Sequence, residues 1–254
     1  MDHPRSSGTQ APATRAALAK RLSRHLLSWL RLNLRYAPAP GVSVFGLNVF
    51  ADPRPGPPRE RSAYALDAAL ALAPATVLDV GSGGGQHALA FAHAGARVVC
   101  VDYGTSIYAR DAAPSPVEVV CADFNQFDPG ERFALVWASH VLEHQRNVAA
   151  FLERLIACCA DGGHVCITVP DPHRNLWGGH LTLWSPGLLA YNVVLCGVDL
   201  SRARLIRGTN EFSLLFQPRR VALPALTYDN GDLKLLSPFL PGGLTENSDG
   251  WHRW

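Results

Sequence analysis

The sequence predicts an α/β protein with a Rossmann-like, doubly wound sheet of five parallel strands finished by an antiparallel hairpin, with an N-terminal helix and a C-terminal extension. Two observations support this fold class. Between residues 62 and 196, short apolar runs typical of strands alternate with segments of helical periodicity. After residue 201, two strand-like runs are joined by the short turn Gly208-Thr209-Asn210, which is typical of a hairpin.

The individual elements follow in order along the chain. In the first half we expect helices over residues 62–72, 85–93 and 106–112, and strands over residues 76–80, 97–101 and 117–121. In the second half we expect strands over residues 133–138 and 164–169, and helices over residues 147–159 and 186–196. The pair Gly162-Gly163 is expected to end the helix at 147–159. The hairpin strands cover residues 202–207 and 211–217.

Changes in composition divide the chain into three regions. Residues 1–60 hold a mobile start, a basic amphipathic helix over residues 15–36 and a proline-rich linker over residues 51–60. Residues 61–218 form the main domain, and residues 219–254 form an irregular extension. No acid occurs between Asp2 and Asp52. We expect the basic helix to pack its apolar stripe on the main domain; the alternatives are an anionic membrane surface, organelle targeting or a disordered arm.

The composition excludes several classes of protein. The 254 residues are 48% hydrophobic and 17% charged with a formal net charge of +2, so neither a disordered chain nor a nucleic-acid partner is favoured. The six cysteines have no CxxC spacing and most lie in apolar runs, which predicts buried thiols in a reducing compartment. We see no apolar run that could span a membrane and no secretory signal, so we expect a cytoplasmic protein, with peripheral membrane contact as the alternative.

The strongest functional signal is the segment VLDVGSGGGQHALAFA at residues 77–92. An apolar strand leads into a glycine-rich turn and then into a helix, so a ligand can approach bare backbone there. Asp102 stands twenty-one positions after Gly81, at the end of the second strand, where a carboxylate can take both hydroxyls of a ribose. A dinucleotide fingerprint would place its third glycine at Gln86, so a nicotinamide dehydrogenase is disfavoured.

This acid-glycine loop, with an acid closing the second strand, resembles the class I S-adenosylmethionine (SAM)-dependent methyltransferases over residues 62–217. The resemblance implies SAM as cofactor, with the loop at its methionine part and Asp102 at its ribose. It also implies that Tyr103 lies against the adenine and that Asp123 meets the adenine amino group; a turn or helix cap is the alternative for Asp123. The cofactor-binding residues that it implies are Asp79, Gly81, Ser82, Gly83, Gly85, Asp102, Tyr103, Asp123, Phe124 and Ser139.

The region FALVWASHVLEHQRN at residues 133–147 is similar to the small-molecule methyltransferases that include the ubiquinone-type O-methyltransferases. By this resemblance Ser139 and His140 lie where the methyl group meets its acceptor, although the commonest family pattern has an acid near this strand end. Transfer is direct, so a base is needed only for a hydroxyl or a protonated nitrogen. We expect His140 first and His180 second as catalytic residues, with Asp171 as an orienting partner; structural histidines are the alternative.

The run His140-Val-Leu-Glu143-His144 also has the HxxEH spacing of inverted zinc peptidases. On a helix this spacing would put two imidazoles and a carboxylate on one side, so a metal-dependent hydrolase and a metal site inside a methyltransferase are alternatives. We predict no metal and expect Glu143 and His144 to fix the following helix. A catalytically silent SAM-fold protein that acts as a binding or scaffold partner is the other alternative.

The acceptor is the least defined part of the function. The aromatic loop at residues 169–189 and the basic N-terminal helix favour a small molecule, lipid or glycan-type acceptor that is partly apolar or membrane-associated. An RNA acceptor would need a broader basic surface. The sequence makes no prediction of the oligomeric state or of the methylated atom.

Overall fold

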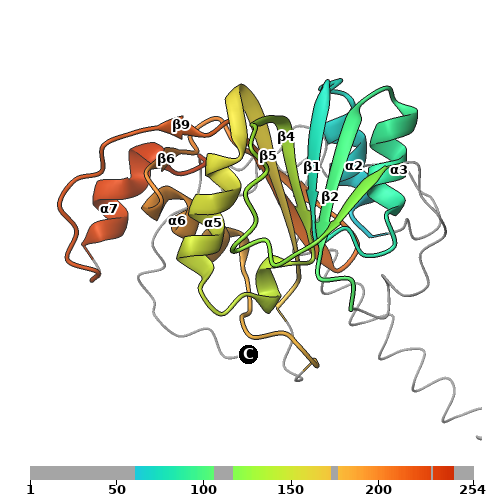
Figure 1. Ribbon diagram of the computed structural model, residues 1–254. Coiled ribbons are helices and arrows are strands. Elements are labelled where there is room, and N and C mark those ends of the chain that lie inside the picture. Colours follow the sequence, from blue (N-terminus) through green and yellow to red (C-terminus); the bar gives the residue numbers. More distant parts are fainter. Residues whose placement is uncertain (1–60, 106–116, 173–176, 230, 243–254) are drawn as a thin grey trace, which may run out of the picture. The chain divides into compact units, whose positions relative to one another are not determined.

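The computed structural model describes residues 61–105, 117–172, 177–229 and 231–242. These residues contain a seven-stranded sheet with the order β3-β2-β1-β4-β5-β8-β7 (Figure 1). The first five strands in the chain are parallel, and β8 pairs with both β5 and β7 in the antiparallel sense, so the predicted fold class is confirmed. The strands of this sheet are β1 (Thr76–Val80), β2 (Arg97–Asp102), β3 (Glu118–Cys121), β4 (Phe133–Ser139), β5 (Cys159–Pro170), β7 (Arg204–Arg207) and β8 (Glu211–Phe216).

The strand order reverses between β1 and β4. The chain moves from β1 outward through β2 to β3, and then returns to the other side of β1 with β4 and β5. Val80, at the end of β1, lies in register with Val101 of β2 and with Ala138 of β4. In an open α/β sheet, ligands bind outside the carboxyl ends of the strands at such a reversal. The fold therefore places the expected site at the edge formed by the ends of β1, β2 and β4.

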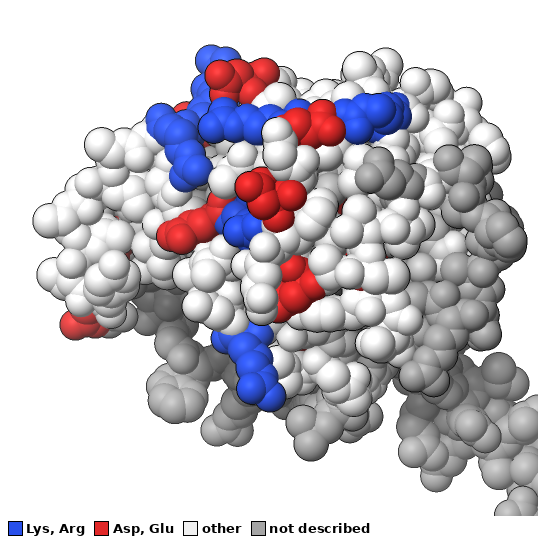
Figure 2. Space-filling view, in the orientation of Figure 1, with Lys and Arg blue, Asp and Glu red and all other residues white. Residues whose placement is uncertain are grey.

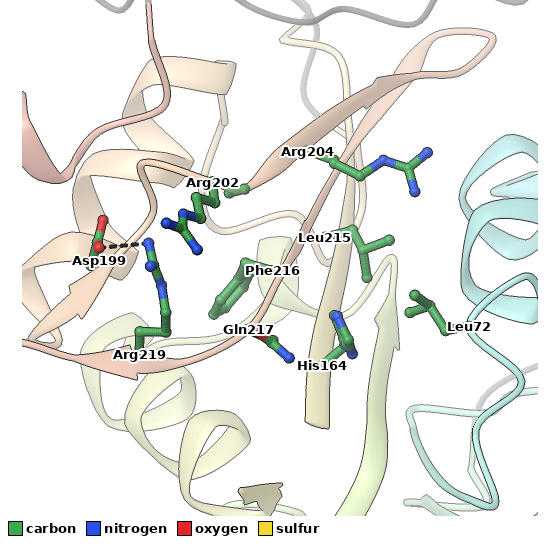
Figure 3. Close-up of a pocket in the computed structure, with 10 residues that line it drawn as sticks. Leu72, His164, Asp199, Arg202, Arg204, Leu215, Phe216, Gln217 and Arg219 are labelled. Carbon is green, nitrogen blue, oxygen red and sulfur yellow. Dashed lines mark hydrogen bonds and ion pairs between the residues drawn. The ribbon is translucent and has the colours of Figure 1, made fainter. Parts of the chain in front are cut away.

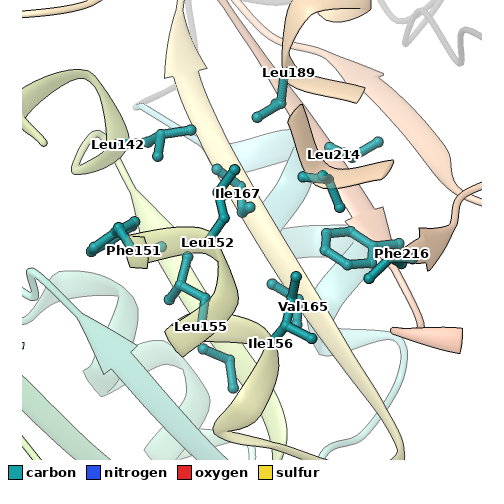
Figure 4. Close-up of a cluster of buried hydrophobic side chains, with 14 of the residues drawn as sticks. Leu142, Phe151, Leu152, Leu155, Ile156, Val165, Ile167, Leu189, Leu214 and Phe216 are labelled. Carbon is teal, nitrogen blue, oxygen red and sulfur yellow. The ribbon is translucent and has the colours of Figure 1, made fainter. Parts of the chain in front are cut away.

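Helices cover both faces of the sheet. Helices α2 (Ala63–Leu70) and α3 (Gln86–His93) pack on one face, while α5 (Val148–Ala157) and α6 (Pro186–Leu195) pack on the other (Figure 1). Helix α5 begins where the Asn147 side chain accepts a hydrogen bond from the Ala150 amide at 3.3 Å. Its buried stripe against the sheet, seen in Figure 4, has the spacing of an amphipathic helix: Phe151, Leu152, Leu155 and Ile156.

The end of helix α5 differs from the prediction. The helix stops at Ala157, and the pair Gly162-Gly163 lies inside strand β5 rather than at the helix terminus. A Cβ on Gly163 would lie 2.8 Å from the Ala134 carbonyl oxygen, and the pairing of β4 with β5 shifts register between Phe133 and Leu135. Gly163 is thus needed because a side chain at this position would collide with the neighbouring strand, as is common for a glycine inside a strand.

The prediction of an irregular C-terminal extension is wrong for the part that the structure describes. Strand β9 (Arg219–Arg220) pairs with β6 (Val198–Asp199), and helix α7 (Asp232–Leu236) continues into the short 3-10 helix η2 (Ser237–Phe239). Leu236 and Leu240 are buried in the same apolar cluster as α5 and α6. The Leu200 amide also donates to the Phe239 carbonyl at 2.8 Å. This C-terminal segment therefore completes the core of the domain, although Pro224, Gly231 and Pro238 interrupt its apolar residues, so no helical or strand period is long enough to reveal this.

Several expectations lie outside the described residues: the mobile start, the basic helix at 15–36, the linker at 51–60 and the short helix at 106–112. No helix in the described part of the chain combines the length and apolar character needed to cross a membrane. All six cysteines are free, and four of them are buried as predicted. Cys121 is exposed and Cys196 is half-buried, so the prediction of buried thiols is wrong for Cys121.

Candidate active site

The glycine turn lies between β1 and α3 at the carboxyl edge of the sheet. Gly81, Gly83 and Gly85 have φ angles of 70°, 52° and 77°, in the left-handed region that disfavours side chains. A Cβ on Gly81 would lie 2.4 Å from Cγ2 of Val141, in the segment that follows β4. The turn therefore requires glycine both for its backbone conformation and for its contact with the next strand connection.

Asp102, at the end of β2, is bonded to the same turn. One carboxylate oxygen accepts the Gly83 amide at 2.9 Å, and the other accepts the Gly104 amide at 2.8 Å. Hydrogen bonds from two amides to a carboxylate are charge-assisted and hold both chain segments in place. The structure therefore brings Asp102 and the glycine turn together at the carboxyl edge of the sheet.

Asp79 is buried in β1, with 2% of its surface exposed. Burial and the negative charge of Asp102 raise its pKa to about 7, and a hydrogen bond involving the Ala88 backbone opposes the shift. Its Oδ2 oxygen has no hydrogen-bond partner among the described residues. A buried carboxylate oxygen without a donor, next to a glycine turn, is suited to a cationic or hydrogen-bond-donating part of a ligand.

The predicted adenine residues separate into two groups. The Tyr103 hydroxyl donates to Oδ1 of Asp123 at 2.8 Å, and this bond lowers the pKa of Asp123. Asp123 also accepts the Asn125 amide at 2.9 Å, so both interpretations of Asp123, as a ligand contact and as a turn cap, agree with its surroundings. Phe124 instead points into the core, where its ring packs edge-on against Phe151 at 5.3 Å between centroids.

His140 follows β4 directly and is held between two buried carboxylates. Its Nε2 lies 2.7 Å from Oε2 of Glu211, and its Nδ1 lies 3.3 Å from Oε1 of Glu143. Glu143 has no exposed surface and Glu211 is 4% exposed. His140 itself adopts a φ of 57°, a conformation that costs a non-glycine residue about 1 kcal/mol and persists only where neighbours hold it.

This arrangement changes the expected chemistry of His140. Burial alone would lower its pKa, but the contacts and charges of Glu143 and Glu211 outweigh burial and raise the pKa to about 9. At neutral pH the imidazole therefore carries protons on both nitrogens and has no lone pair for a substrate proton. The geometry does not support the predicted role of His140 as the general base.

The same network reaches back to the start of the domain. The Ser62 amide donates to Oε1 of Glu211 at 2.5 Å, and the Ser62 and Ser139 hydroxyls lie 2.7 Å apart. Ser62 and Asn210, which precedes Glu211, have φ angles of 59° and 58°, so both adopt the left-handed backbone conformation, as His140 does. The sequence does not single out Ser62 or Glu211, because Glu211 meets His140 and Ser62 only after β8 has paired with β5.

His180 lies beside Glu143 and His144. The His144 and His180 rings meet edge-on at 4.9 Å, and Nδ1 of His144 lies 2.7 Å from the Gly179 carbonyl oxygen. The Leu181 amide donates to the Glu143 carbonyl at 2.7 Å, which docks this loop on the site. One ligand atom from each of Glu143, His144 and His180 lies within 4.8 Å of the others, a set that could hold Zn²⁺ or a similar ion.

This cluster differs from the metal set considered from the sequence. His180 takes the place of His140, whose ring nitrogens face Glu143 and Glu211. The segment Leu142–His144 forms the 3-10 helix η1, not an α-helix, so the helical geometry that the HxxEH spacing requires is absent from it. The zinc-peptidase interpretation therefore has no geometric support.

Asp171 forms a two-pronged ion pair with Arg207 of β7, with both N···O distances at 2.5 Å. Its backbone amide donates to the Asn210 carbonyl at 2.9 Å. Both contacts attach the loop after β5 to the β7–β8 hairpin. The carboxylate that was expected to orient a histidine is therefore engaged with a guanidinium.

Comparison with known proteins places this geometry in a family. The model of a family described as "Methyltransferase domain" matches residues 54–207. A ubiquinone biosynthesis O-methyltransferase from Bradyrhizobium sp. (strain ORS 278) is 32% identical over 164 residues, which cover 63% of this chain and 58% of that protein. A protein of the same name from Rhodopseudomonas palustris (strain BisB5) is 27% identical over 218 residues, covering 84% and 79%. The chain thus spans less than two thirds of the length of the Bradyrhizobium relative.

The comparison with solved structures gives matches at low sequence identity. The 1,6-didemethyltoxoflavin-N1-methyltransferase of Burkholderia thailandensis, solved with its substrate and S-adenosylhomocysteine (SAH), has a TM-score of 0.49 and 19% identity over 84% of this chain and 94% of that one. The family match covers more than half of the chain and agrees with the sheet order and the glycine turn described above. The chain therefore belongs to the methyltransferase-domain family, as its resemblance to the class I SAM-dependent enzymes predicted.

Proposed function

We propose that this chain is a SAM-dependent methyltransferase that moves a methyl group directly from SAM to a small-molecule acceptor. The observation that carries the proposal is the glycine turn tied to Asp102 by the Gly83 and Gly104 amides, beside the unsatisfied buried oxygen of Asp79. This arrangement offers a backbone cradle and two carboxylates at the point where the strand order reverses. SAM supplies a methyl group that its sulfonium has already activated.

Each part of the cofactor has a counterpart in this edge of the sheet. Asp79 and the turn residues Gly81, Ser82, Gly83 and Gly85 would hold the methionine part, where the Oδ2 oxygen of Asp79 lacks a donor. Asp102 would hold the ribose. Tyr103, which is 58% exposed, and Asp123 would hold the adenine. Phe124 supports this subsite from the core, and Ser139, at the end of β4, would lie where the methyl group meets its acceptor.

We assign His140 to positioning and not to proton transfer. Its protonated ring, held by Glu143 and Glu211, fixes the turn that follows β4 against Gly81 through Val141. Alignment of the reacting atoms is the main requirement of direct methyl transfer, so a rigid turn is a direct contribution to rate. His180 remains the candidate to accept a proton from an acceptor hydroxyl, and Asp171 holds the neighbouring loop through Arg207.

The acceptor that best fits this edge is a partly apolar small molecule. Large apolar side chains are about half exposed on the loop after β5 and at the start of α6, next to His180: Trp177, Leu181, Leu183 and Leu188. Exposed apolar side chains that gather in one place favour a ligand with apolar surface. The names of the relatives point to an oxygen acceptor in ubiquinone biosynthesis. Lipid-linked and glycan-type acceptors, cytoplasmic location and membrane contact by the basic helix stay predictions.

The test has a binding stage and a turnover stage. Calorimetric titration of the protein with SAH, SAM and NAD should show binding of the first two and not of NAD, and Asp102→Ala should weaken the binding of SAH and SAM by at least about fiftyfold. Asp128→Ala is the matched control, because Asp128 accepts the Gly130 amide at 2.9 Å in a similar turn but lies away from the glycine loop in an exposed position. Binding of NAD in place of SAH would contradict the proposal.

Turnover is then measured as SAH formed from SAM with phenols that carry an isoprenoid tail, with amino sugars and with plain catechols. Formation of a methylated product establishes the activity and the acceptor class. A protein that binds SAH tightly but methylates none of these acceptors would favour the silent scaffold. Hydrolysis of peptides that depends on added Zn²⁺ would favour the metal-dependent hydrolase.

A further inference from the structure

A cavity lies at the opposite end of the sheet from the glycine turn. It has a volume of about 110 Å³ and is formed by β5, β7, β8 and β9 with the end of α2 (Figure 3). His164 in its wall is in register with Leu135 of β4, which pairs with Val77 near the start of β1. Val80, which precedes the glycine turn, lies three residues after Val77 in β1. Three residues of strand span about 10 Å, so the cavity and the glycine turn lie at least that far apart along the sheet.

The cavity is lined by more positive than negative charge. Arg202, Arg204 and Arg219 contribute guanidinium groups, whereas the single acid in the wall is Asp199. The Asp199 carboxylate forms an ion pair with Arg219 at 2.6 Å and accepts a hydrogen bond from the Ser201 amide at 2.8 Å. Figure 2 shows that Lys and Arg gather along the edge of the domain that is uppermost in that view. The cavity therefore keeps a net positive charge after its internal pairing.

Arg202 is the group that lacks a direct partner. Within the described ranges it makes no hydrogen bond and no ion pair, because the nearby carboxylate of Asp199 is held by Arg219. Figure 3 shows its guanidinium directed toward Phe216, on the same side of the cavity as Arg219. Two guanidinium groups that share one carboxylate can take a second anion with charge-assisted, two-pronged hydrogen bonds.

The floor of the cavity is apolar. Leu215 and Phe216 of β8 are each 3% exposed and line it together with Ala203. A low-dielectric floor strengthens the attraction between a guanidinium and an anion compared with the same pair in open water. Burial lowers the pKa of His164, so its ring is neutral at pH 7 and can donate one hydrogen bond without adding charge.

We propose that this cavity binds a small oxyanion, a carboxylate or phosphate group, through Arg202 and Arg219, at a site separate from the glycine turn. The apolar floor accommodates the body of a small organic anion. Asp199 occupies part of the guanidinium surface and limits the affinity. The site is independent of the methyl-transfer edge and does not rest on the proposed function.

The test is titration of the full chain with inorganic phosphate and, separately, with benzoate, at fixed ionic strength and pH 7, followed by calorimetry. We expect saturable binding of at least one of the two anions and a loss of about tenfold in affinity in Arg202→Ala. Arg132→Ala is the matched control, because Arg132 is an exposed arginine that pairs with Asp161 at 3.2 Å outside the cavity. The affinity of Arg132→Ala for the anion should equal that of the wild type.

A variant that binds the anion more tightly than the wild type cannot owe its effect to misfolding. Asp199→Asn keeps an oxygen for the Ser201 amide but frees the Arg219 guanidinium, so it should bind the anion more tightly than the wild type, by about threefold or more. Binding of phosphate alone or of benzoate alone identifies the group that the site takes. Absence of saturable binding of both anions, or equal affinity in wild type and Arg202→Ala, overturns the proposal.

Discussion

The two halves of the active edge are stabilised by different means. On the β1–β2 side, the backbone stabilises the site: three glycines with positive φ form the turn, and two amides donate hydrogen bonds to Asp102. On the β4–β5–β8 side, buried charged side chains stabilise the site, with His140 between Glu143 and Glu211. Backbone geometry is specified by a short local sequence, whereas a charge network depends on residues that are far apart in the chain. The sequence located the first half, whereas in the second half it singled out His140 and Glu143 but not their partner Glu211.

The largest effect should follow from adding one methyl group to the backbone half. Gly81→Ala places a Cβ 2.4 Å from Val141 and strains a φ of 70°, so SAH affinity should fall by about a hundredfold or more. Gly85→Ala is the matched control, because Gly85 lies in the same turn and has a φ of 77° with nothing within 4 Å of its Cβ position. Calorimetry of both variants separates the clash from the backbone strain. Equal losses in the two would contradict the packing of Gly81 on Val141.

The next largest effect concerns the charged half. Glu211→Ala leaves a protonated His140 and the Ser62 amide without their partner, so the free energy of unfolding should fall by about 3 kcal/mol, as for other broken buried pairs. Glu131→Ala removes an exposed partner of Arg97 and should change the same quantity by less than about 1 kcal/mol. Urea unfolding at pH 7 measures both. A loss below about 1 kcal/mol for Glu211→Ala would show that the network contributes little to the stability of the fold.

The charged half should also make stability depend on pH. The pKa of His140 is raised from 6.5 to about 9 on folding, so its contribution to stability is full below about pH 6.5 and is lost as the pH rises through 9. At roughly 1.4 kcal/mol per pKa unit, the contribution is at most about 3 kcal/mol. His140→Gln should flatten this part of the profile in urea unfolding between pH 6 and pH 10. A wild-type profile as flat as that of the variant would place the folded pKa near 6.5.

The smallest effect is expected from metal removal. The groups that could hold an ion, Glu143, His144 and His180, lie on the acceptor side, whereas the predicted cofactor contacts are on the glycine side. Treatment with EDTA should therefore change SAH affinity by less than about twofold. Calorimetry before and after chelation provides the measurement, with metal content determined in parallel. A large loss of SAH affinity that added Zn²⁺ restores would mean that the two halves are coupled through a metal.

The sequence predicted what local patterns determine. Strand β1 agrees with its predicted bounds, and the apolar stripe of α5 and the closing hairpin follow from periodicity and turn residues. The pair Gly162-Gly163 predicts a helix end from sequence, because glycine is common at helix ends. Glycine is also common where strands approach closely, and only the pairing of β4 with β5 shows that this is its role here. Helix α7 was missed because its few apolar residues have meaning only against the finished core.

The candidate site divides in the same way. Asp79, Asp102 and the glycines were found because their spacing is short and fixed. Glu211 was missed because it lies seventy-one positions from His140 and meets it only after the hairpin has folded beside β5. The protonation of His140 could not be foreseen either, since it depends on two carboxylates from different elements. A charge that tertiary contacts determine has no signature in one segment of sequence.

One calorimetric experiment tests the separation of the two halves. SAH is titrated into the wild type, Asp102→Ala and Glu211→Gln at pH 7, with circular dichroism to establish that each variant is folded. We predict that Asp102→Ala loses SAH affinity by at least about fiftyfold, while Glu211→Gln stays within about threefold of the wild type although it is less stable. Retention of SAH affinity in Asp102→Ala, or a loss in folded Glu211→Gln as large as that in Asp102→Ala, would contradict a cofactor half that is built and held separately from the charged half.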